Sequence, residues 1–458
     1  MSSSSLPEQA ATKLSCIVIG AGLGGLAAAI AIARKGHSVT VFEQAPALGE
    51  VGAGIQMPPN TTCLVEYLGL TDKFAGHVVL PRAVSMRRFA NGALLGSTPL
   101  NPFLTKRYRA PYWLIHRADY HRILHDGAVD NGVDIRINSR VVAYDDAAPS
   151  VTLADGSVHT ADFVLAADGI RSLVRSLMMP ELTDEYVPSG SIAYRTTIDA
   201  AKMRAHPELA ELLDSPFTNC WMGPGGHVIA YPIRNKTLYN VVMLAPGDEL
   251  EDGLWANKAT RAEVLETYKD WDPKLVKILG MIDVVLKWKV CYLKRLDTWV
   301  SPSGKLALLG DSAHATVPYL AQGAAQAIED GVTVAELVSA ARSPADVPAL
   351  LRLYEKVREP RATRVQLGSM RNADFWHLAD GPQQQRRDAD MLRLAAALND
   401  EAVDLHEYVL DEEAMARAAV PEYDIKNPNP WSDVVFQPWL FGHNAVKTAQ
   451  YYLKQAGY

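Results

Sequence analysis

Two side chains in the middle of the chain have the types and the spacing of an acid-base pair. His227 and Tyr231 lie four residues apart in the segment His-Val-Ile-Ala-Tyr-Pro. In a β-strand, residues i and i+4 point to the same face, so both side chains could reach one ligand. Histidine is suited to act as a general base near neutral pH. The alternative is structural: His227 would be hydrogen-bonded within the sheet and Tyr231 would lie in the core. This alternative stays open because no third residue independently marks the pair as catalytic.

A glycine-rich turn near the N-terminus predicts a dinucleotide site. In Gly-Ala-Gly-Leu-Gly-Gly, Gly20 permits a tight turn, Gly22 lets the backbone approach a pyrophosphate, and Gly25 lets a helix pack on the preceding strand. N–H groups at the start of that helix would face the anion, and Leu23 is expected among the residues that contact the cofactor. Glu43, at the end of the next strand, would hold the adenosine ribose hydroxyls. The alternative is a glycine-rich turn in an unrelated α/β protein.

A β-α-β unit is needed to position these residues. The expected elements are strands at 16–19, 38–43, 163–167 and 306–309, helices at 26–34 and 323–341, and a hairpin around 151–158. Between about 189 and 295 the pattern becomes rich in strands, including 191–198, 227–232 and 237–243, with helical character at 261–281. This change predicts a second domain inserted into the first.

Two acidic motifs distinguish FAD from NAD, which the glycine turn does not. Asp168 begins Asp-Gly-Ile-Arg-Ser after an apolar strand, and Asp311 lies in Gly-Asp-Ser-Ala-His-Ala-Thr-Val-Pro. With these motifs in this order, the chain resembles the class A flavoprotein aromatic monooxygenases, which include salicylate hydroxylase, 3-hydroxybenzoate 6-hydroxylase and 6-hydroxynicotinate 3-monooxygenase. The resemblance runs from about residue 15 to at least residue 331 and implies bound FAD.

The resemblance implies further contacts with the flavin. Asp311 would accept hydrogen bonds from ribityl hydroxyls, and Pro318 would border the isoalloxazine ring. A helix that starts at Gly323, Ala324 and Ala325 would direct its N–H groups at the flavin.

Three more residues occupy family positions beside the cofactor. Arg117 lies in the helix after the first crossover, and Ala53 and Gly54 lie in the loop next to the ribityl chain. A surface charge on a helix is the alternative for Arg117.

The same family suggests roles for the substrate-side residues. There the His-x-x-x-Tyr-Pro arrangement orients and deprotonates a phenol, which implies that role for His227 and Tyr231. Arg195 lies at the family's Tyr/Phe-Arg strand position, where it could bind a substrate carboxylate or stabilise a phenolate or the reduced flavin. A structural salt bridge is the alternative for Arg195. His314 is expected to be a structural neighbour of the flavin.

The reaction implied by the resemblance is hydroxylation of a phenolic or hydroxylated aromatic acid. NADPH or NADH reduces FAD, O2 adds at C4a to form a hydroperoxide, and the activated phenol takes one oxygen atom. Oxidative decarboxylation results if a carboxylate occupies the attacked carbon. Alternatives are hydroxylation or dearomatisation of a larger phenolic secondary metabolite, and a flavin reductase on the same scaffold. Because a second GxGxxG unit is absent, NAD(P)H is expected as a transient substrate.

Composition favours small partners. Among 458 residues, 45 basic and 52 acidic side chains give a net charge of −7 without a long block of one sign, so nucleic acid and membrane partners are not expected. The four cysteines lack CxxC spacing, which argues against a disulfide framework or metal site and favours a cytoplasmic location. The apolar run 17–33 contains four glycines and reads as strand, turn and helix rather than a membrane segment. A monomer or homodimer is expected.

The predicted fold class is α/β. It comprises a Rossmann-like FAD-binding domain of the GR2 type, an inserted β-sheet substrate domain and a C-terminal helical region. The predicted boundaries are 1–12 for a disordered tail, 13–188 with 296–370 for the FAD-binding domain, 189–295 for the substrate domain and 371–458 for the helical region. The segment 428–439, rich in proline and tryptophan, is expected to be an ordered arm on the main body. In the ending Trp-Leu-Phe-Gly-His-Asn, His443 and Asn444 replace the Tyr and Asp of salicylate-hydroxylase-like enzymes.

Overall fold

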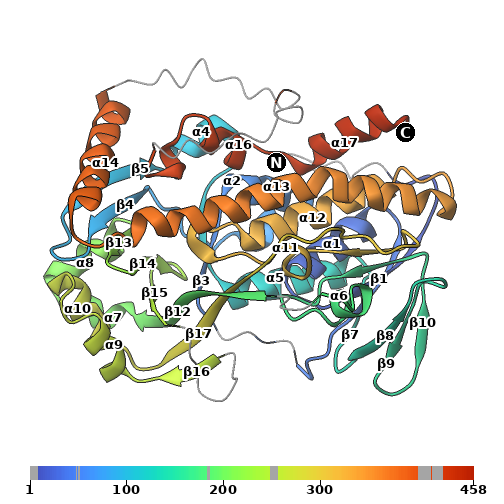
Figure 1. Ribbon diagram of the computed structural model, residues 1–458, viewed down its shortest axis with the longest axis horizontal. Coiled ribbons are helices and arrows are strands. Elements are labelled where there is room, and N and C mark those ends of the chain that lie inside the picture. The colour runs from blue at the N-terminus through green and yellow to red at the C-terminus, as the bar shows by residue number, and fades with distance from the viewer. Residues whose placement is uncertain are drawn as a thin grey trace.

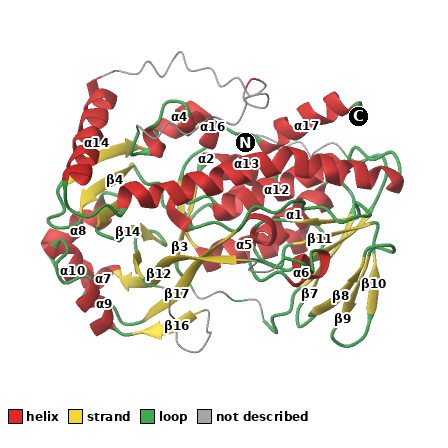
Figure 2. Ribbon diagram, in the orientation of Figure 1, coloured by secondary structure: helices red, strands yellow, loops and turns green. Residues whose placement is uncertain are grey.

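Two large β-sheets and the helices that cover them form the framework of the chain (Figures 1 and 2). The computed structural model describes residues 9–47, 49, 52–182, 186–247, 256–400, 414 and 427–458. The predicted α/β class is confirmed, because a parallel sheet with helices is combined with a second, mainly antiparallel sheet.

The first sheet has five parallel strands. In spatial order they are β18 (Leu306–Leu308), β11 (Phe163–Ala166), β1 (Ser15–Ile19), β2 (Ser38–Phe42) and β7 (Asp134–Arg136). Strands β11 and β18 are buried throughout, which is typical of parallel strands covered on both faces. The carboxyl ends of β1, β11 and β18 therefore lie next to one another, and each leads into one of the predicted motifs.

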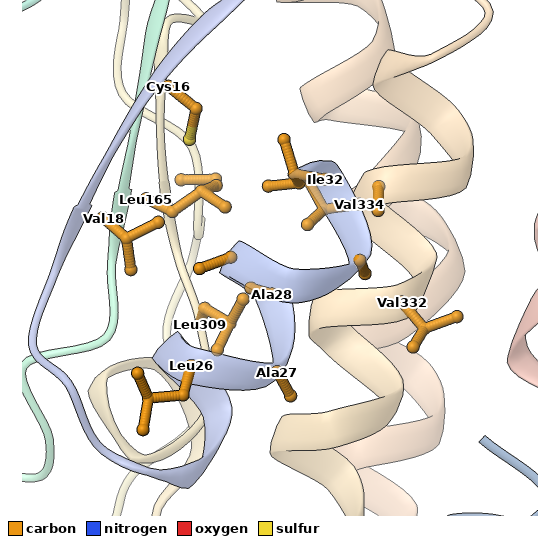
Figure 3. Close-up of a cluster of buried hydrophobic side chains, with 14 of the residues drawn as sticks. Cys16, Val18, Leu26, Ala27, Ala28, Ile32, Leu165, Leu309, Val332 and Val334 are labelled. Atoms are coloured by element: carbon orange, nitrogen blue, oxygen red, sulfur yellow. The ribbon is translucent and has the colours of Figure 1, made fainter. Parts of the chain in front are cut away.

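Helix α1 (Leu23–Arg34) packs tightly against α12 (Gly323–Val338). Figure 3 shows this apolar cluster, in which Ala27, Ala28 and Ile32 of α1 are gathered with Val332 and Val334 of α12. A Cβ at Gly331 would lie 2.8 Å from the Ala28 Cα, so glycine is what permits the close approach of the two helices. This packing holds the N-termini of both helices in fixed places.

The second sheet has eight strands. In spatial order they are β16 (Ala256–Ala259), β17 (Val285–Leu293), β12 (Tyr186–Asp199), β15 (Leu238–Pro246), β14 (Gly226–Ile233), β13 (Thr218–Gly223), β4 (Ala83–Arg88) and β5 (Leu94–Pro99). Six of these strands fall in or next to the predicted inserted domain. Strands β4 and β5 come from the segment assigned to the FAD-binding domain, so the substrate sheet is built from two separate parts of the chain.

Two small sheets complete the strands. They are β8 (Val141–Asp145) with β9 (Ser150–Leu153) and β10 (Val158–Thr160), and β3 (Gly54–Met57) with β6 (Trp113–His116). The predicted hairpin around 151–158 is confirmed as β9 and β10.

Shorter helices lie around the sheets. They are α2 (Pro59–Tyr67), α3 (Thr71–Phe74), α4 (Phe103–Tyr108), α5 (Arg117–Asp130), α6 (Leu173–Met178), α7 (Ala200–Arg204), α8 (Pro207–Asp214), α9 (Arg261–Thr267), α10 (Pro273–Leu279) and α11 (Asp311–His314).

A long helix, α13 (Val347–Trp376), crosses the molecule. It packs on α12 at the FAD-binding sheet and reaches β14 of the second sheet (Figure 1). It is followed by α14 (Pro382–Asp400), α16 (Phe436–Phe441) and α17 (Ala445–Ala456). The predicted arm at 428–439 is packed on the body, since Trp431 and Trp439 are both buried. Residues 401–413 and 415–426 of the predicted helical region lie outside the described residues.

The part of the predicted N-terminal tail that the structure describes contacts the body of the protein. Residues 1–8 lie outside the described residues. Gln9 Nε2 donates to the Arg34 carbonyl (2.8 Å), the Ala10 N–H to the Lys35 carbonyl (2.9 Å), and Thr12 Oγ1 to the carbonyl of Arg342 (2.9 Å). Gln9, Ala10 and Thr12 are therefore attached to the body by hydrogen bonds.

Burial of His37 leads to a prediction about acid stability. The Leu14 N–H donates to His37 Nδ1 (3.0 Å), and this bond requires that nitrogen to be unprotonated. Burial and Lys35 lower the pKa of His37 from 6.5 to about 4. His37 therefore binds a proton near pH 6.5 in the unfolded chain but only near pH 4 in the folded chain. We expect about 3 kcal/mol of stability to be lost as the pH falls through this window.

Urea denaturation of the wild type and of His37→Asn at neutral and mildly acidic pH measures this contribution. The variant should be less sensitive to acid over that window because asparagine does not titrate. Equal acid sensitivity of the two proteins would contradict the assignment to His37.

Candidate active site

Two connected cavities run along the carboxyl ends of the parallel strands. We call the larger one, of about 380 Å³, the main cavity, and the smaller one, of about 330 Å³, the distal cavity. Both are lined by Gly22, Ala167 and Gly169, so they meet at the glycine turn and form one elongated site. Such a shape fits a dinucleotide whose pyrophosphate lies where the cavities join.

The glycines of the turn have different reasons to be glycine. Gly20 has a φ of +99°, and a Cβ there would lie 2.5 Å from the Ala167 carbonyl oxygen. A Cβ at Gly25 would lie 2.1 Å from the Gly20 carbonyl oxygen. At Gly22 a Cβ would meet no other protein atom within 4 Å. The fold itself therefore requires Gly20 and Gly25, whereas Gly22 keeps open the space where the cavities join.

The N-terminus of α1 faces this junction. Gly22 is its N-cap, no side chain caps the helix, and its first turn carries no acidic residue. The N–H groups of the first turn and the helix dipole are thus available to an anion such as a pyrophosphate. Leu23, the first helical residue, lines the main cavity.

Two carboxylates line the distal cavity. Glu43 follows β2 and accepts the N–H groups of Ala21 and Ala45, both at 2.8 Å, which orients its carboxylate. Asp168 Oδ2 accepts the Val174 N–H (3.2 Å), while Asp168 Oδ1 is buried without a hydrogen-bond partner among the described residues. Burial raises the pKa of Asp168. A buried acceptor without a partner is costly, and a ligand that donates a hydrogen bond there would satisfy it.

A third carboxylate, Asp311, begins α11 and is open to the main cavity. Its place depends on Asp330 of α12, whose Oδ2 accepts the Gly310 N–H (2.9 Å) and contacts His314 Nε2 (2.6 Å). His314 is buried and contacts Asp330, and it is not among the residues that line the main cavity; its place as a neighbour of the flavin stays a prediction.

The other predicted cofactor residues divide into two groups. Arg117, Gly54, Gly323 and Ala324, together with Pro318 at the start of a 3₁₀ turn, line the main cavity. Ala53 and Ala325 are buried beside it and are not among its lining residues. The Ala53 carbonyl accepts the Arg117 N–H (2.9 Å), so Ala53 helps to fix the backbone of Arg117.

The opposite wall of the main cavity is one face of the second sheet. His227, Ile229 and Tyr231 alternate along β14 and point to this face. The strand register places His227 opposite Leu244, and Ile229 opposite Val242. The sequence spacing thus correctly predicted that His227 and Tyr231 share one cavity.

Arg195 of β12 joins this wall because it pairs with Val242 across the sheet. Its guanidinium lies 5.8 Å from the centre of the Trp288 ring, and no described carboxylate forms an ion pair with it. Burial lowers the pKa of Arg195, while nearby Tyr231 acts in the opposite direction. Arg195 therefore has no carboxylate partner for a structural salt bridge in the described part of the chain. The cation instead faces the cavity, where negative charge on a ligand would stabilise it.

Burial sets the protonation state of His227 and Tyr231. It lowers the pKa of His227 well below 6.5, assisted by nearby His377, so the imidazole is neutral. It raises the pKa of Tyr231 despite Arg195, so the phenol keeps its proton. A neutral imidazole can accept a proton, and a neutral phenol can donate a hydrogen bond to a ligand.

His377 and Gln56 are among the polar residues at the site that sequence reasoning missed. His377, directly after α13, has its Nε2 2.8 Å from His227 Nδ1. Gln56 of β3 lines the main cavity and accepts a hydrogen bond from Tyr112 Oη (3.0 Å). Alternation along β3 places Gln56 two residues from Gly54, which could have suggested its direction. No local signal indicates that His377 meets His227.

Comparison with known proteins agrees with this geometry. Residues 13–369 match the family described as FAD binding domain. The chain belongs to this family of FAD-dependent monooxygenases. It is 33% identical over 438 residues to the FAD-dependent monooxygenase OpS4 of Beauveria bassiana (strain ARSEF 2860), covering 95% of this chain and 96% of that protein. It is also 33% identical to 3-hydroxybenzoate 6-hydroxylase of Polaromonas naphthalenivorans (strain CJ2), covering 80% of this chain and 88% of that protein.

The fold is shared with solved structures. A salicylate hydroxylase substrate complex superposes with a TM-score of 0.71 at 25% identity, covering 87% of this chain and 98% of that one. The predicted class A flavoprotein monooxygenase, with FAD as its cofactor, is confirmed. None of the helices in the described ranges is long and apolar enough to cross a membrane.

Proposed function

We propose that the chain uses NAD(P)H and O2 to hydroxylate a phenolic or hydroxylated aromatic acid. The observation that carries the proposal is that His227, Tyr231 and Arg195 line the main cavity together with Pro318 and the N-terminus of α12. These residues combine a base, a hydrogen-bond donor and a cation with apolar neighbours, which suits an aromatic ring that bears a hydroxyl and an anionic group. The relatives named for hydroxybenzoate and salicylate support this choice of ring.

FAD is proposed to lie along both cavities. Glu43 would bind the adenosine ribose, Asp168 would accept a hydrogen bond near the junction, and the turn at Gly22 would receive the pyrophosphate. Arg117 and Asp311 would hold the ribityl side. Bound FAD supplies the hydride acceptance and dioxygen activation that no side chain provides.

The protein's own task is to bind, orient and deprotonate the substrate. We propose that His227 accepts the phenolic proton at Nε2, because Nδ1 is used by His377. Removal of that proton raises the electron density of the ring carbon that receives oxygen. Tyr231 would orient the phenolate, and Arg195 would bind a carboxylate or stabilise the negative charge that develops. Ile229, Val242 and Leu244 would hold the ring and exclude water.

The test begins with purified, FAD-loaded protein. NADH and NADPH oxidation is measured with hydroxybenzoates, hydroxynicotinates and larger phenols, and each product is identified by mass. A product that gains one oxygen supports the proposal, and loss of CO2 from it identifies oxidative decarboxylation. NAD(P)H oxidation without any oxygenated product across the panel would instead identify a reductase.

Gly22 offers a test of the proposed FAD position. Since a Cβ at position 22 meets no protein atom, Gly22→Val should leave the thermal stability of the apoprotein unchanged. The added side chain would occupy the pyrophosphate space, so we expect FAD affinity to fall by about 100-fold or more, measured by flavin fluorescence titration. Gly25→Val is the comparison, because it should destabilise the apoprotein as well. Unchanged FAD affinity in Gly22→Val would place the pyrophosphate elsewhere.

A further inference from the structure

The imidazole rings of His227 and His377 form a continuous pair that leads away from the main cavity. His227 is almost fully buried, and its Nδ1 lies 2.8 Å from His377 Nε2. The ring centres are 5.1 Å apart with an interplanar angle of 29°. His377 is only partly buried, so the pair has one ring at the cavity and the other toward the outside of the protein.

Aromatic side chains hold both rings in place. Tyr319 meets His227 edge to face at 5.1 Å and meets His377 at 5.5 Å. Trp376 meets His227 edge to face at 5.0 Å. The backbone of the second histidine is tied to the sheet as well, since the Gly225 N–H donates to the His377 carbonyl (3.0 Å). Neither ring can turn away without disturbing these contacts, so the hydrogen bond between them is a fixed feature.

The chemistry of the cavity creates a need for such a pair. A proton taken from a buried phenol would produce an imidazolium at position 227, which lies in apolar surroundings and next to a second histidine. Burial lowers the pKa of His227 well below its usual value, so a proton would not remain there. The pKa of His377 is also lowered by burial, to about 4, and this ring too would pass a proton on to water rather than keep it.

We propose that His377 is a relay that carries the substrate's proton from His227 to solvent. The phenolic proton is transferred to His227 Nε2, the Nδ1 proton of His227 passes to His377 Nε2, and the Nδ1 proton of His377 leaves to water. No electrons are transferred, and the net result is one phenolate and one released proton. This sequence requires the tautomer of His227 in which Nδ1 carries the hydrogen and Nε2 faces the ligand. It rests on the proposed function, which assigns the phenol and the base.

The relay role and a merely orienting role make different predictions for one substitution. In His377→Gln, the amide can still hydrogen-bond to His227 Nδ1 and hold the ring, but it does not exchange protons as an imidazole does. We expect FAD binding and phenol affinity to be unchanged, while proton release on phenol binding and product formation slow by about tenfold. His377→Ala should show at least the same loss, with partial recovery on addition of free imidazole.

The measurements use FAD-loaded enzyme mixed rapidly with 3-hydroxybenzoate, or with salicylate if only that acid is oxygenated. A pH-indicator dye reports proton release, and product mass and NAD(P)H oxidation report turnover. Asp380→Asn is the matched control. Asp380 lies three residues after His377, and its replacement alters an exposed ion pair with Arg88 but leaves both imidazoles intact. This control should behave as the wild type.

A second measurement needs no phenol. Nitrogen-15 NMR of the histidine side chains in the FAD-loaded protein identifies the tautomer of His227. A proton on Nδ1 supports the relay, and a proton on Nε2 would overturn it, because the nitrogen facing the cavity could not then act as a base. The relay is also overturned if His377→Gln releases protons and forms product at the wild-type rate. Failure of the wild type to oxygenate any panel phenol would overturn the proposed function itself, which is a different result.

Discussion

His227→Asn should retain FAD and lose most of its oxygenation activity. The substitution removes the only imidazole that lines the described part of the main cavity, while the residues proposed to hold FAD are untouched. Because a positioned general base contributes about 100-fold or more, we expect kcat for product formation to fall by at least that factor. Phenol affinity should change much less, since Arg195, Tyr231 and the apolar wall remain.

The measurement combines the flavin absorbance spectrum, NAD(P)H oxidation and product mass. The matched control is His206→Asn, which makes the same replacement at a histidine before α8 whose side chain does not cap that helix. The control should retain wild-type activity. Product formation by His227→Asn at the wild-type rate would contradict the assignment of the base.

Glu329→Gln should cause the largest loss of stability of any substitution considered. The Glu329 carboxylate is fully buried and accepts hydrogen bonds from Arg358 Nη1 (2.6 Å), Arg361 Nε (2.7 Å) and Asn60 Nδ2 (2.7 Å). Burial opposes its ionisation, but the charges of Arg361 and Arg358 outweigh burial and lower the pKa of Glu329. Loss of the negative charge would leave Arg361 buried without its only carboxylate partner among the described residues.

We expect the midpoint of urea denaturation to shift by the equivalent of about 3 to 5 kcal/mol. The effect should extend to the C-terminal segment, because Arg361 also donates to the carbonyls of Trp439 and Leu440, both at 3.0 Å. Glu208→Gln is the control, since it removes an exposed ion pair with Lys277 and should leave stability nearly unchanged. Similar losses of stability in the two variants would show that the buried ion pairs of Glu329 contribute no more than an exposed ion pair does.

This buried cluster also explains the altered C-terminal ending. His443 Nε2 lies 3.5 Å from the Glu329 carboxylate, and Arg361 lies 4.7 Å from the centre of the Trp439 ring. Burial and the two arginines lower the pKa of His443 despite Glu329, so its imidazole is neutral. The ending is therefore attached to α12 and α13, the helices that position Asp311 and His377. Sequence comparison alone left its role open.

The parts of the site that sequence predicted well are local. The turn at Gly20 to Gly25 follows a strand and starts a helix, and the motif predicts this order from neighbouring residues, although the atoms that crowd Gly20 belong to the distant Ala167. The shared direction of His227 and Tyr231 follows from the two-residue period of a strand. Start and end points were less accurate, since α1 begins at Leu23 rather than 26 and β12 begins at Tyr186 rather than 191.

Other parts depended on contacts between distant segments. Strands β4 and β5 belong to the second sheet, although they precede its other strands by many residues. Their sequence pattern does not indicate which strand they pair with. Ala53 and Ala325 were predicted at the cofactor, but they lie behind the lining, because the direction of a side chain in a loop or first helical turn is decided by packing.

The sequence by itself determined the glycine turn and the face shared by His227 and Tyr231, because backbone geometry and short-range spacing decide these features. Its resemblance to the class A flavoprotein monooxygenases indicated the cofactor class. Only the tertiary structure decided what surrounds them. His377 lies 150 residues from His227, and Arg195 reaches the cavity through its pairing with Val242. Such contacts depend on strand register and on the path of α13 across the molecule. Register and path result from packing of the whole chain rather than from any local pattern.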